Sequence, residues 1–433
     1  MKLVVGMLLA LILLAGAPAG TLQWAAPVLV VSDTVFASRP ALAGRDSTLW
    51  AVWWQDTGTV AAQHDGNVWH PLEFVQSGGP AGVAFTLDDE HAPWIAYGRS
   101  EAREVQCVFT RRSADTWTRP AVFFRDTTIM TPTPALAPHP QRGVQAAWVN
   151  FSDPACLLTA RGTSDSWTAP QVVNSFPGYL FHHHKDIARL RDGRLLVAWY
   201  CFPESGGRNL YTSFGSGDSW SRPVHVVFPS PQYGVTSTLV WMDASGVARI
   251  AWQALDTETM QDKLYSARFD GTQWVEPVLL DSGGSFVGCT DTAGWGWILY
   301  VRPNGQSVVR YHDGSNWTAP MPGPPDSLSS AGIGVAHGRI WVLWLKPVSE
   351  TRALLYCSSA GHPLAVMDPP ALPQQPSLPV ASPSVIRAGT SLHLTGLRPG
   401  QNVQLLDAAG RKLNPQAEVL STSSLPPGVY FLH

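Results

Sequence analysis

The sequence predicts an all-β protein: a seven-bladed β-propeller closed by an N-terminal strand, followed by a small β-sandwich-like C-terminal domain. Three observations predict the propeller. Tryptophan is followed closely by proline at seven places, 43 to 54 residues apart, and a four-stranded blade has a similar length. A second apolar run ending in an aromatic follows each tryptophan after 26 to 32 residues. The 19 Trp, 38 Gly and 36 Pro are typical of short strands joined by tight turns.

The repeated tryptophans mark one strand of each blade. They are Trp24, Trp69, Trp117, Trp167, Trp220, Trp274 and Trp317, and their prolines are Pro27, Pro71, Pro120, Pro170, Pro223, Pro277 and Pro320. A large ring at the same place in every blade favours a wedge that packs neighbouring blades together. The alternative is a set of exposed platforms on which sugars stack, as in a multivalent lectin.

The other strands follow from the period of the apolar residues. The runs ending in Trp53, Tyr97, Trp148, Trp199, Trp252, Tyr300 and Trp344 are expected to be buried second strands. Third strands, such as residues 264–269 and 308–311, then alternate apolar with polar residues. Each ends in a hairpin turn before the tryptophan, where Gly66, Gly271 and Gly314 supply the positive φ that such turns need.

The strand count predicts how the ring closes. The last repeat, residues 329–367, lacks a tryptophan-proline strand, and the first such strand, residues 24–31, has no blade before it. If the N-terminal strand completes the last blade, seven full blades form and no unpaired strand remains at the seam.

The two ends of the chain differ from the propeller, which we place at residues 21–367. Residues 1–20 have a positive start at Lys2, an apolar run at 3–14 and small residues before Gly20, as in a secretory signal peptide. A retained membrane anchor is the alternative. Residues 368–383 are rich in proline and are expected to form a stiff linker. A β domain at 384–433 follows.

Composition limits the ligands. The net charge of -3 lacks the basic footprint that nucleic acid requires. The cysteines, Cys107, Cys156, Cys201, Cys289 and Cys357, have no metal-ligand spacing. They are expected to be small buried residues, with one disulfide left open. We predict a monomer without a cofactor or bound metal.

The hairpins resemble the Asp-box (BNR) repeats of sialidase-like propellers, over residues 22–367. The resemblance rests on Asp65-Gly66, Asp270-Gly271 and Asp313-Gly314, each just before a tryptophan. It implies a carboxylate-binding arginine cluster with acidic partners on one face, and Arg39 stands where the family has its first arginine. Further candidates in loops after second strands are Arg99, Arg208, Arg302, Glu204 and Asp256. Solvated loop charges are the alternative.

A histidine run is the sharpest local feature. His182, His183 and His184 stand in the long connection into blade four, where they could act as acid and base or bind a divalent metal. Some seven-bladed polysaccharide lyases place histidine and tyrosine in such a position, and Tyr233 in the next connection is the candidate companion. Structural packing at the channel mouth is the alternative.

The C-terminal segment resembles the sorting domain of type IX secretion substrates. The similarity rests on Asp407-Ala-Ala-Gly410-Arg411 and Gly428-Val429-Tyr430. It implies a partner in the secretion machinery and a secreted or outer-membrane surface location in a bacterium.

Two function classes are open. The first, which we favour from the sequence, is a non-catalytic propeller that binds an extracellular glycan or protein through one face. The second is a sialidase-like hydrolase or polysaccharide lyase acting on extracellular glycans. A structural spacer or adhesin is a third possibility, because a fold does not determine its function.

Overall fold

The computed structural model divides the chain into two units, residues 1–365 and 366–433. The described residues of the first unit are 22–35, 40–55, 58–77, 81–101, 103–127, 130–151, 155–176, 180–202, 209–216, 219–228, 232–256, 258–325, 328, 330–349 and 352–363. In the second unit five short strands are described. None of these residues is helical, so the described chain is all-β, as predicted.

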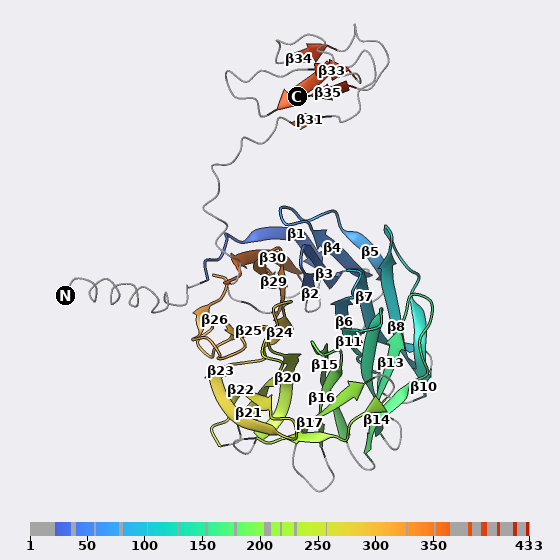
Figure 1. Ribbon diagram of the computed structural model, residues 1–433, viewed down its shortest axis with the longest axis vertical. Helices are drawn as coiled ribbons and strands as arrows, with labels where there is room; N and C mark the ends of the chain where they lie inside the picture. The colour runs from blue at the N-terminus through green and yellow to red at the C-terminus, as the bar shows by residue number, and fades with distance from the viewer. Residues whose placement is uncertain are drawn as a thin grey trace, which may run out of the picture. The chain divides into compact units, whose positions relative to one another are not determined.

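Seven antiparallel sheets form a ring, which Figure 1 views along its axis. The innermost strands are β2 (Ala41–Arg45), β6 (Ala81–Leu87), β11 (Ala135–Pro138), β15 (Leu180–Arg189), β20 (Gln232–Met242), β24 (Val287–Thr290) and β28 (Ser330–Ala336). The second strands are β3 (Thr48–Gln55), β7 (Pro93–Glu101), β12 (Val144–Asn150), β16 (Leu195–Phe202), β21 (Ala248–Asp256), β25 (Gly296–Val301) and β29 (Arg339–Pro347). All seven predicted aromatic residues lie in these second strands, so that prediction is confirmed.

The outer strands complete each blade. The third strands are β4 (Gly58–His64), β8 (Glu104–Ser113), β13 (Ala155–Gly162), β17 (Asn209–Ser216), β22 (Gln261–Phe269), β26 (Ser307–His312) and β30 (Arg352–Gly361). The fourth are β5 (Glu73–Ser77), β9 and β10 (Thr116–Trp117, Ala121–Asp126), β14 (Gln171–Phe176), β18 and β19 (Ser219–Trp220, Val224–Val226), β23 (Trp274–Ser282), β27 (Met321–Pro322) and β1 (Val28–Val35). Blades one to seven are numbered here by their innermost strands, from β2 to β28.

The N-terminal strand closes the ring as predicted. β1 pairs antiparallel with β30 of the last blade, with Val28 opposite Cys357 and Val35 opposite Arg352. The pairing begins before the strand proper, because Trp24 forms a bridge with Ala360 and its Nε1 donates to the Pro322 carbonyl at 2.9 Å. The two ends of the propeller are therefore held in one sheet, and no seam strand is left without a partner.

The repeated tryptophans are wedges between blades, which confirms the packing interpretation. Trp117 packs edge-on to Trp50 of the preceding blade, with ring centroids 6.2 Å apart. Trp317 meets Trp241 at 5.7 Å, and Trp167 stacks on Phe123 at 4.1 Å. The other four also belong to clusters that join two blades. A multivalent lectin that stacks a sugar on every one of these rings is therefore disfavoured, because the rings pack against neighbouring blades.

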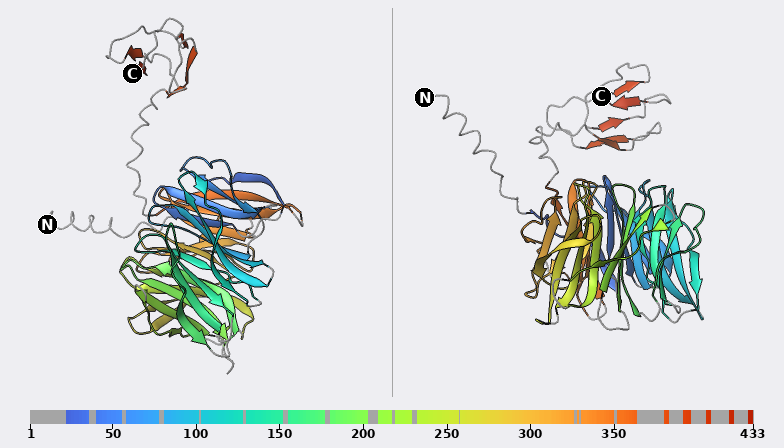
Figure 2. Two further views of the ribbon diagram at one scale, coloured as in Figure 1. Left: turned by 90° about the vertical axis from the view of Figure 1, so that its right-hand side faces the viewer. Right: turned by 60° about the horizontal axis from the view of Figure 1, so that its bottom comes forward.

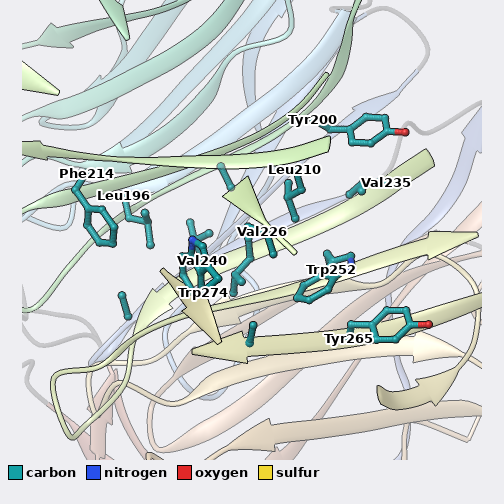
Figure 3. Close-up of a cluster of buried hydrophobic side chains, with 14 of the residues drawn as sticks. Leu196, Tyr200, Leu210, Phe214, Val226, Val235, Val240, Trp252, Tyr265 and Trp274 are labelled. Atoms are coloured by element: carbon teal, nitrogen blue, oxygen red, sulfur yellow. The ribbon is translucent and has the colours of Figure 1, made fainter. Parts of the chain in front are cut away.

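The core lies between the sheets, and Figure 3 shows the cluster that joins blades four and five. Leu196, Tyr200 and Phe214 come from blade four, and Trp252 and Trp274 from blade five. The Trp274 Nε1 donates to Thr212 Oγ1 across the interface at 2.7 Å. Truncating a buried aromatic side chain of this kind typically costs about 3–5 kcal/mol, so such rings define which blades are neighbours.

Two rims bound the ring, and Figure 2 shows them from the side. On the loop rim, second strands turn into third strands and the chain passes from blade to blade. On the hairpin rim lie the turns between first and second strands and between third and fourth strands. Gly66, Gly271 and Gly314 of the latter have φ of 102°, 105° and 99°, as their turns require.

A second repeat, on the turns between first and second strands, was not predicted. Asp88 and Asp291 each accept a hydrogen bond from the indole of the tryptophan six residues later, Trp94 at 2.8 Å and Trp297 at 2.9 Å. Asp243 accepts a hydrogen bond from Nε of Arg249, also six residues later, at 2.5 Å. An aspartate six residues before a buried tryptophan is the sequence signal that identifies these turns.

All five cysteines are described, and none forms a disulfide. Cys107, Cys201 and Cys357 are buried, in keeping with their expected packing role. Within the described ranges no helix is long and apolar enough to cross a membrane. The predicted signal peptide and residues 368–379 of the predicted proline-rich linker lie outside the described residues, whereas residues 380–382 of that linker form strand β31 of the second unit.

The second unit is described through β31 (Val380–Ser382), β32 (Ser391–Thr395), β33 (Leu405–Asp407), β34 (Val419–Ser421) and β35 (Tyr430–Leu432). β33 pairs with β35, with Asp407 opposite Tyr430, so one residue of each motif that carries the sorting-domain resemblance lies on adjacent strands. The other motif residues, 408–411, 428 and 429, lie outside the described residues. The sorting function stays a prediction.

Candidate functional site

The histidine run lies within the innermost strand of blade four. The expectation of a loop connection was wrong, because β15 starts at Leu180 and stays paired with the long strand β16. Phe181 pairs with Cys201 and Lys185 with Trp199, so His182, His183 and His184 face a single residue of β16. A bulge of this kind re-aims side chains and is common beside functional sites.

The segment carrying Tyr233 is bulged in the same way. Tyr233 lies in β20 and not in a connecting loop, because β20 pairs with β21 as far as Gln232. Register shifts fall on either side of Val235. The amide of Gly234, which has a φ of 78°, donates to the Tyr200 hydroxyl of blade four at 2.9 Å. Since β15 and β20 are neighbours, the structure brings the two predicted segments to adjacent bulges on the loop rim.

Two charged residues follow the histidines in β15. Lys185 Nζ donates to Thr133 Oγ1 at 3.0 Å, and burial lowers the pKa of the amine to about 8. Asp186 points to the other side of the strand, where its carboxylate accepts the Val240 amide at 2.8 Å. Burial raises the pKa of Asp186 to about 7. No role was predicted for Lys185 or Asp186 from the sequence, although both adjoin the histidine run.

A close backbone contact holds the loop that bears Thr133. This segment, residues 130–134, leads into blade three and crosses Gly98 of blade two. A Cβ at Gly98 would lie 1.8 Å from the Pro132 carbonyl oxygen, and one at Gly82 would lie 2.7 Å from Thr133 Cγ2. Only glycine allows the backbones to approach so closely. The sequence offers no signal for Thr133, since its contact spans blades.

Two buried polar atoms near the rim have no partner within the protein. Ser237 and Gln253 face each other across β20 and β21. The Ser237 Oγ and Gln253 Oε1 make no hydrogen bond, although both residues are buried. Buried polar atoms normally bond to protein or ordered water, so these two provide unused hydrogen-bonding capacity at the rim of blade five.

The predicted charged residues that are described have local partners. Arg99 lies in strand β7 rather than in a loop, and binds Gln106 Oε1 at 2.7 Å. Arg302 binds Asp281 at 2.7 Å. Asp256 binds Lys263 at 2.9 Å and accepts amides of its own turn. These residues belong to blades two, six and five, so they do not share one blade.

Three other predicted residues, Arg39, Glu204 and Arg208, lie outside the described residues. Their part in a site stays a prediction. Among the residues whose side chains are described, no three His, Cys, Asp or Glu come together as metal ligands would.

The axis of the ring holds a cavity of about 490 Å³, lined by all seven innermost strands. Toward the hairpin rim, Asp89 of blade two binds Arg45 of blade one at 2.7 Å and Arg189 of blade four at 2.5 Å. Arg191 of blade four reaches the Thr292 carbonyl of blade six at 2.7 Å. These hydrogen bonds join blades across the channel near the hairpin rim. The bulged strands β15 and β20 start at the opposite end, on the loop rim.

No protein-family model matches the chain, and no curated protein matches it in sequence. The fold is similar to that of the polysaccharide lyase Uly1, with a TM-score of 0.54 and 7% identity over 79% of this chain and 100% of that one. A PL25 ulvan lyase aligns with a TM-score of 0.52 and 11% identity over 76% and 95%. Sialidases also align, among them the Hadza microbial sialidase Hz136, with a TM-score of 0.42 and 14% identity over 72% and 73%. The two lyases, with TM-scores above 0.5, support the β-propeller fold of this chain.

Proposed function

We propose that the propeller binds an acidic polysaccharide across its loop rim and cleaves it by β-elimination beside a uronate residue. The observation that carries this proposal is the pair of adjacent bulges in β15 and β20. They place His182–His184 and Tyr233 on one rim, with Lys185 just below the histidines in the same strand.

The chemistry needs a base, an acid and a positive charge. The base removes the proton from C5 of the uronate, and its electron pair forms the C4–C5 double bond. The C4–O bond then breaks, and the acid protonates the departing oxygen. A histidine of the run and Tyr233 are the residue types that serve as such a pair. The Lys185 ammonium, which stays protonated below about pH 8, offsets the charge of the uronate carboxylate.

The fold neighbours suggest which substrate to test first. The ulvan lyase has also been solved bound to the disaccharide repeat GlcA(1-4)Rha3S, and that form aligns with a TM-score of 0.51. We therefore expect a glucuronate-containing, sulfated polysaccharide to be the best first candidate. The identity of 11% means that the likeness supports the fold and not the substrate.

Hydrolysis of the sialidase type has less support. It requires several arginines that converge on one carboxylate, whereas Arg99 is bound to Gln106 and Arg302 to Asp281 in places well separated round the ring. Non-catalytic binding at the same rim is the second candidate, because binding needs the adjacent bulges of β15 and β20 but no acid and base.

The test is incubation of the full chain with ulvan and with other uronate polysaccharides, following the ultraviolet absorbance of the new double bond. Formation of an unsaturated product supports elimination. Reducing ends without absorbance indicate hydrolysis instead. Retention on a polysaccharide column with neither product supports the binding candidate, and absence of all three contradicts the proposal.

The variants that localise the activity are the double substitution His183→Ala with His184→Ala, and Tyr233→Phe. Each is expected to lower the rate by about 10²–10⁴-fold, as loss of a general acid or base does. The matched control is His70→Ala, because His70 is an exposed histidine on the hairpin rim. It should leave the rate unchanged, and an equal loss there would place the chemistry elsewhere.

The proposal places the protein outside the cell, as the features at 1–20 and 384–433 predict. Secretion with cleavage near Gly20 and sorting through the C-terminal domain are part of it, as is a monomeric state. The mass of the protein recovered from the medium or the cell surface of the native host tests the cleavage near Gly20, and its recovery from either place tests export.

A further inference from the structure

A second cavity, of about 360 Å³, lies at the seam where the ring closes. One wall is the fourth strand of blade seven, with Val28 and Leu29 of β1. The other is the turn between β4 and β5 of blade one, with Val68 and Trp69. The indole of Trp341 lies deeper. All the residues that line this seam pocket are described, and they are remote in sequence from the histidine run and Tyr233.

The seam differs from the other blade interfaces in its tryptophan segment. One residue separates Trp69 from Pro71, whereas two separate tryptophan from proline in the other six copies. The side chains round the pocket mouth are exposed, with fractions of 58% at Val28, 44% at Leu29 and 57% at Val68.

The lining carries no charge at neutral pH. His64 is its one titratable ring, and burial, together with His337, lowers the pKa of that ring to about 4. Its Nδ1 accepts the Gly66 amide at 2.9 Å, which also favours the neutral form. An acidic or basic ligand would therefore enter this pocket without a counter-charge, which is unfavourable.

Polar groups are few and lie beside the apolar wall. The Ser358 hydroxyl donates to the Ala25 carbonyl at 2.7 Å and keeps its acceptor capacity. The Ser359 hydroxyl accepts from Arg339 Nε at 2.9 Å and can still donate. Asn67 is exposed on the turn. A half-buried indole next to such groups suits a molecule with one apolar face and several hydroxyls.

We propose that the seam pocket binds one neutral sugar residue, which stacks its apolar face on Trp69 and hydrogen-bonds with Asn67 and Ser359, the serine on the same face of β30 as Cys357. The volume of 360 Å³ lies in the lower part of the range for small-ligand sites. It suits one or two sugar rings and excludes a longer chain. The seam pocket is separate from the loop rim, so this inference does not depend on whether the rim binds or cleaves a polysaccharide.

The test measures binding of free monosaccharides to the full chain by saturation-transfer NMR and calorimetry. The probes are D-glucose, D-galactose and L-rhamnose as neutral sugars, D-glucuronate as the charged one and phenol as an apolar one. We expect at least one neutral sugar to bind, and D-glucuronate to bind at least tenfold more weakly than that sugar. Preference for phenol or for glucuronate would overturn the sugar assignment, as would absence of binding by every neutral sugar.

A matched pair of variants locates the site. Val68→Trp places an indole over the pocket mouth, and Val172→Trp makes the same change on β14 of blade three, where the valine is equally exposed at 57%. Val68→Trp should lower the affinity for the neutral sugar at least tenfold, and Val172→Trp should leave that affinity unchanged. Equal affinity in both variants would contradict the location, provided that both keep the wild-type Tm.

Discussion

The sharpest prediction concerns the contact that holds the loop at residues 130–134, and the change is Gly98→Ala. The added methyl would lie 1.8 Å from the Pro132 carbonyl oxygen and 2.8 Å from Thr131 Cγ2. Restoring ordinary contact requires the loop to move by roughly 1.5 Å. Overpacking of this kind costs about 1–3 kcal/mol, which corresponds to a fall in Tm of roughly 1–4 °C for a propeller of this size.

The same shift should be felt at the loop rim. Thr133 belongs to this loop, and its hydroxyl accepts from Lys185 Nζ at 3.0 Å. A displacement larger than 1 Å would break that hydrogen bond. We therefore expect Gly98→Ala to weaken polysaccharide binding or turnover at temperatures where the variant is still fully folded.

Two further glycines supply controls for the same Gly→Ala change. A Cβ at Gly44 would lie 2.3 Å from the Val335 carbonyl oxygen, between blades one and seven, whereas a Cβ at Gly361 would meet nothing within 4 Å. Gly44→Ala should lower the Tm without a specific effect on the rim, and Gly361→Ala should change neither. The three Gly→Ala variants are distinguished by their Tm, measured by circular dichroism, and by their affinity for the polysaccharide. A wild-type Tm for Gly98→Ala would refute the close approach, and a lowered Tm with wild-type affinity would refute the role of the loop at the rim.

Three other predictions concern the scaffold. Burial lowers the pKa of His312 from 6.5 to about 4, so the folded protein resists its protonation, and this stability is present above pH 6.5 and lost as the pH falls toward 4. His312→Asn should therefore reduce the loss in the free energy of unfolding between pH 6.5 and 4 by on the order of 3 kcal/mol, which is seen as a smaller fall in Tm. An unchanged pH profile of the Tm would contradict the lowered pKa of His312. Tyr300→Phe removes a 2.5 Å hydrogen bond to Asp281 and should cost about 1.5–3 kcal/mol in urea unfolding, whereas a change below about 0.5 kcal/mol would show that the bond contributes little. Deleting residues 22–31 removes most of the pairing between β1 and β30 and should cause aggregation in light scattering; a monomer with the wild-type Tm would contradict ring closure by this strand.

Much of the scaffold is predictable because each blade repeats the same local physics. The Trp–Pro period, the aromatic second strands and the Asp–Gly turns each report on contacts within one blade or between neighbours. Even the pairing of β1 with β30, across more than 300 residues, follows from counting strands.

The site is less predictable because its geometry depends on register and on contacts between blades. The histidine run reads as a connection in the sequence, and only pairing with β16 shows that it is a bulge within a strand. The contact of Lys185 with Thr133 and the cross-channel bridge of Asp89 with Arg189 join residues 52 and 100 positions apart. No local pattern signals such pairs, whereas the aspartates six residues before Trp94 and Trp297 could have been found.

Hydrogen exchange with and without an acidic polysaccharide tests most directly whether the loop rim is the functional surface. We expect added protection in the bulged parts of β15 and β20, at residues 180–186 and 232–237, and none in the hairpins around Gly66 and Gly314. Protection confined to the hairpin rim, or spread evenly over both rims, would contradict the assignment of function to the bulged strands.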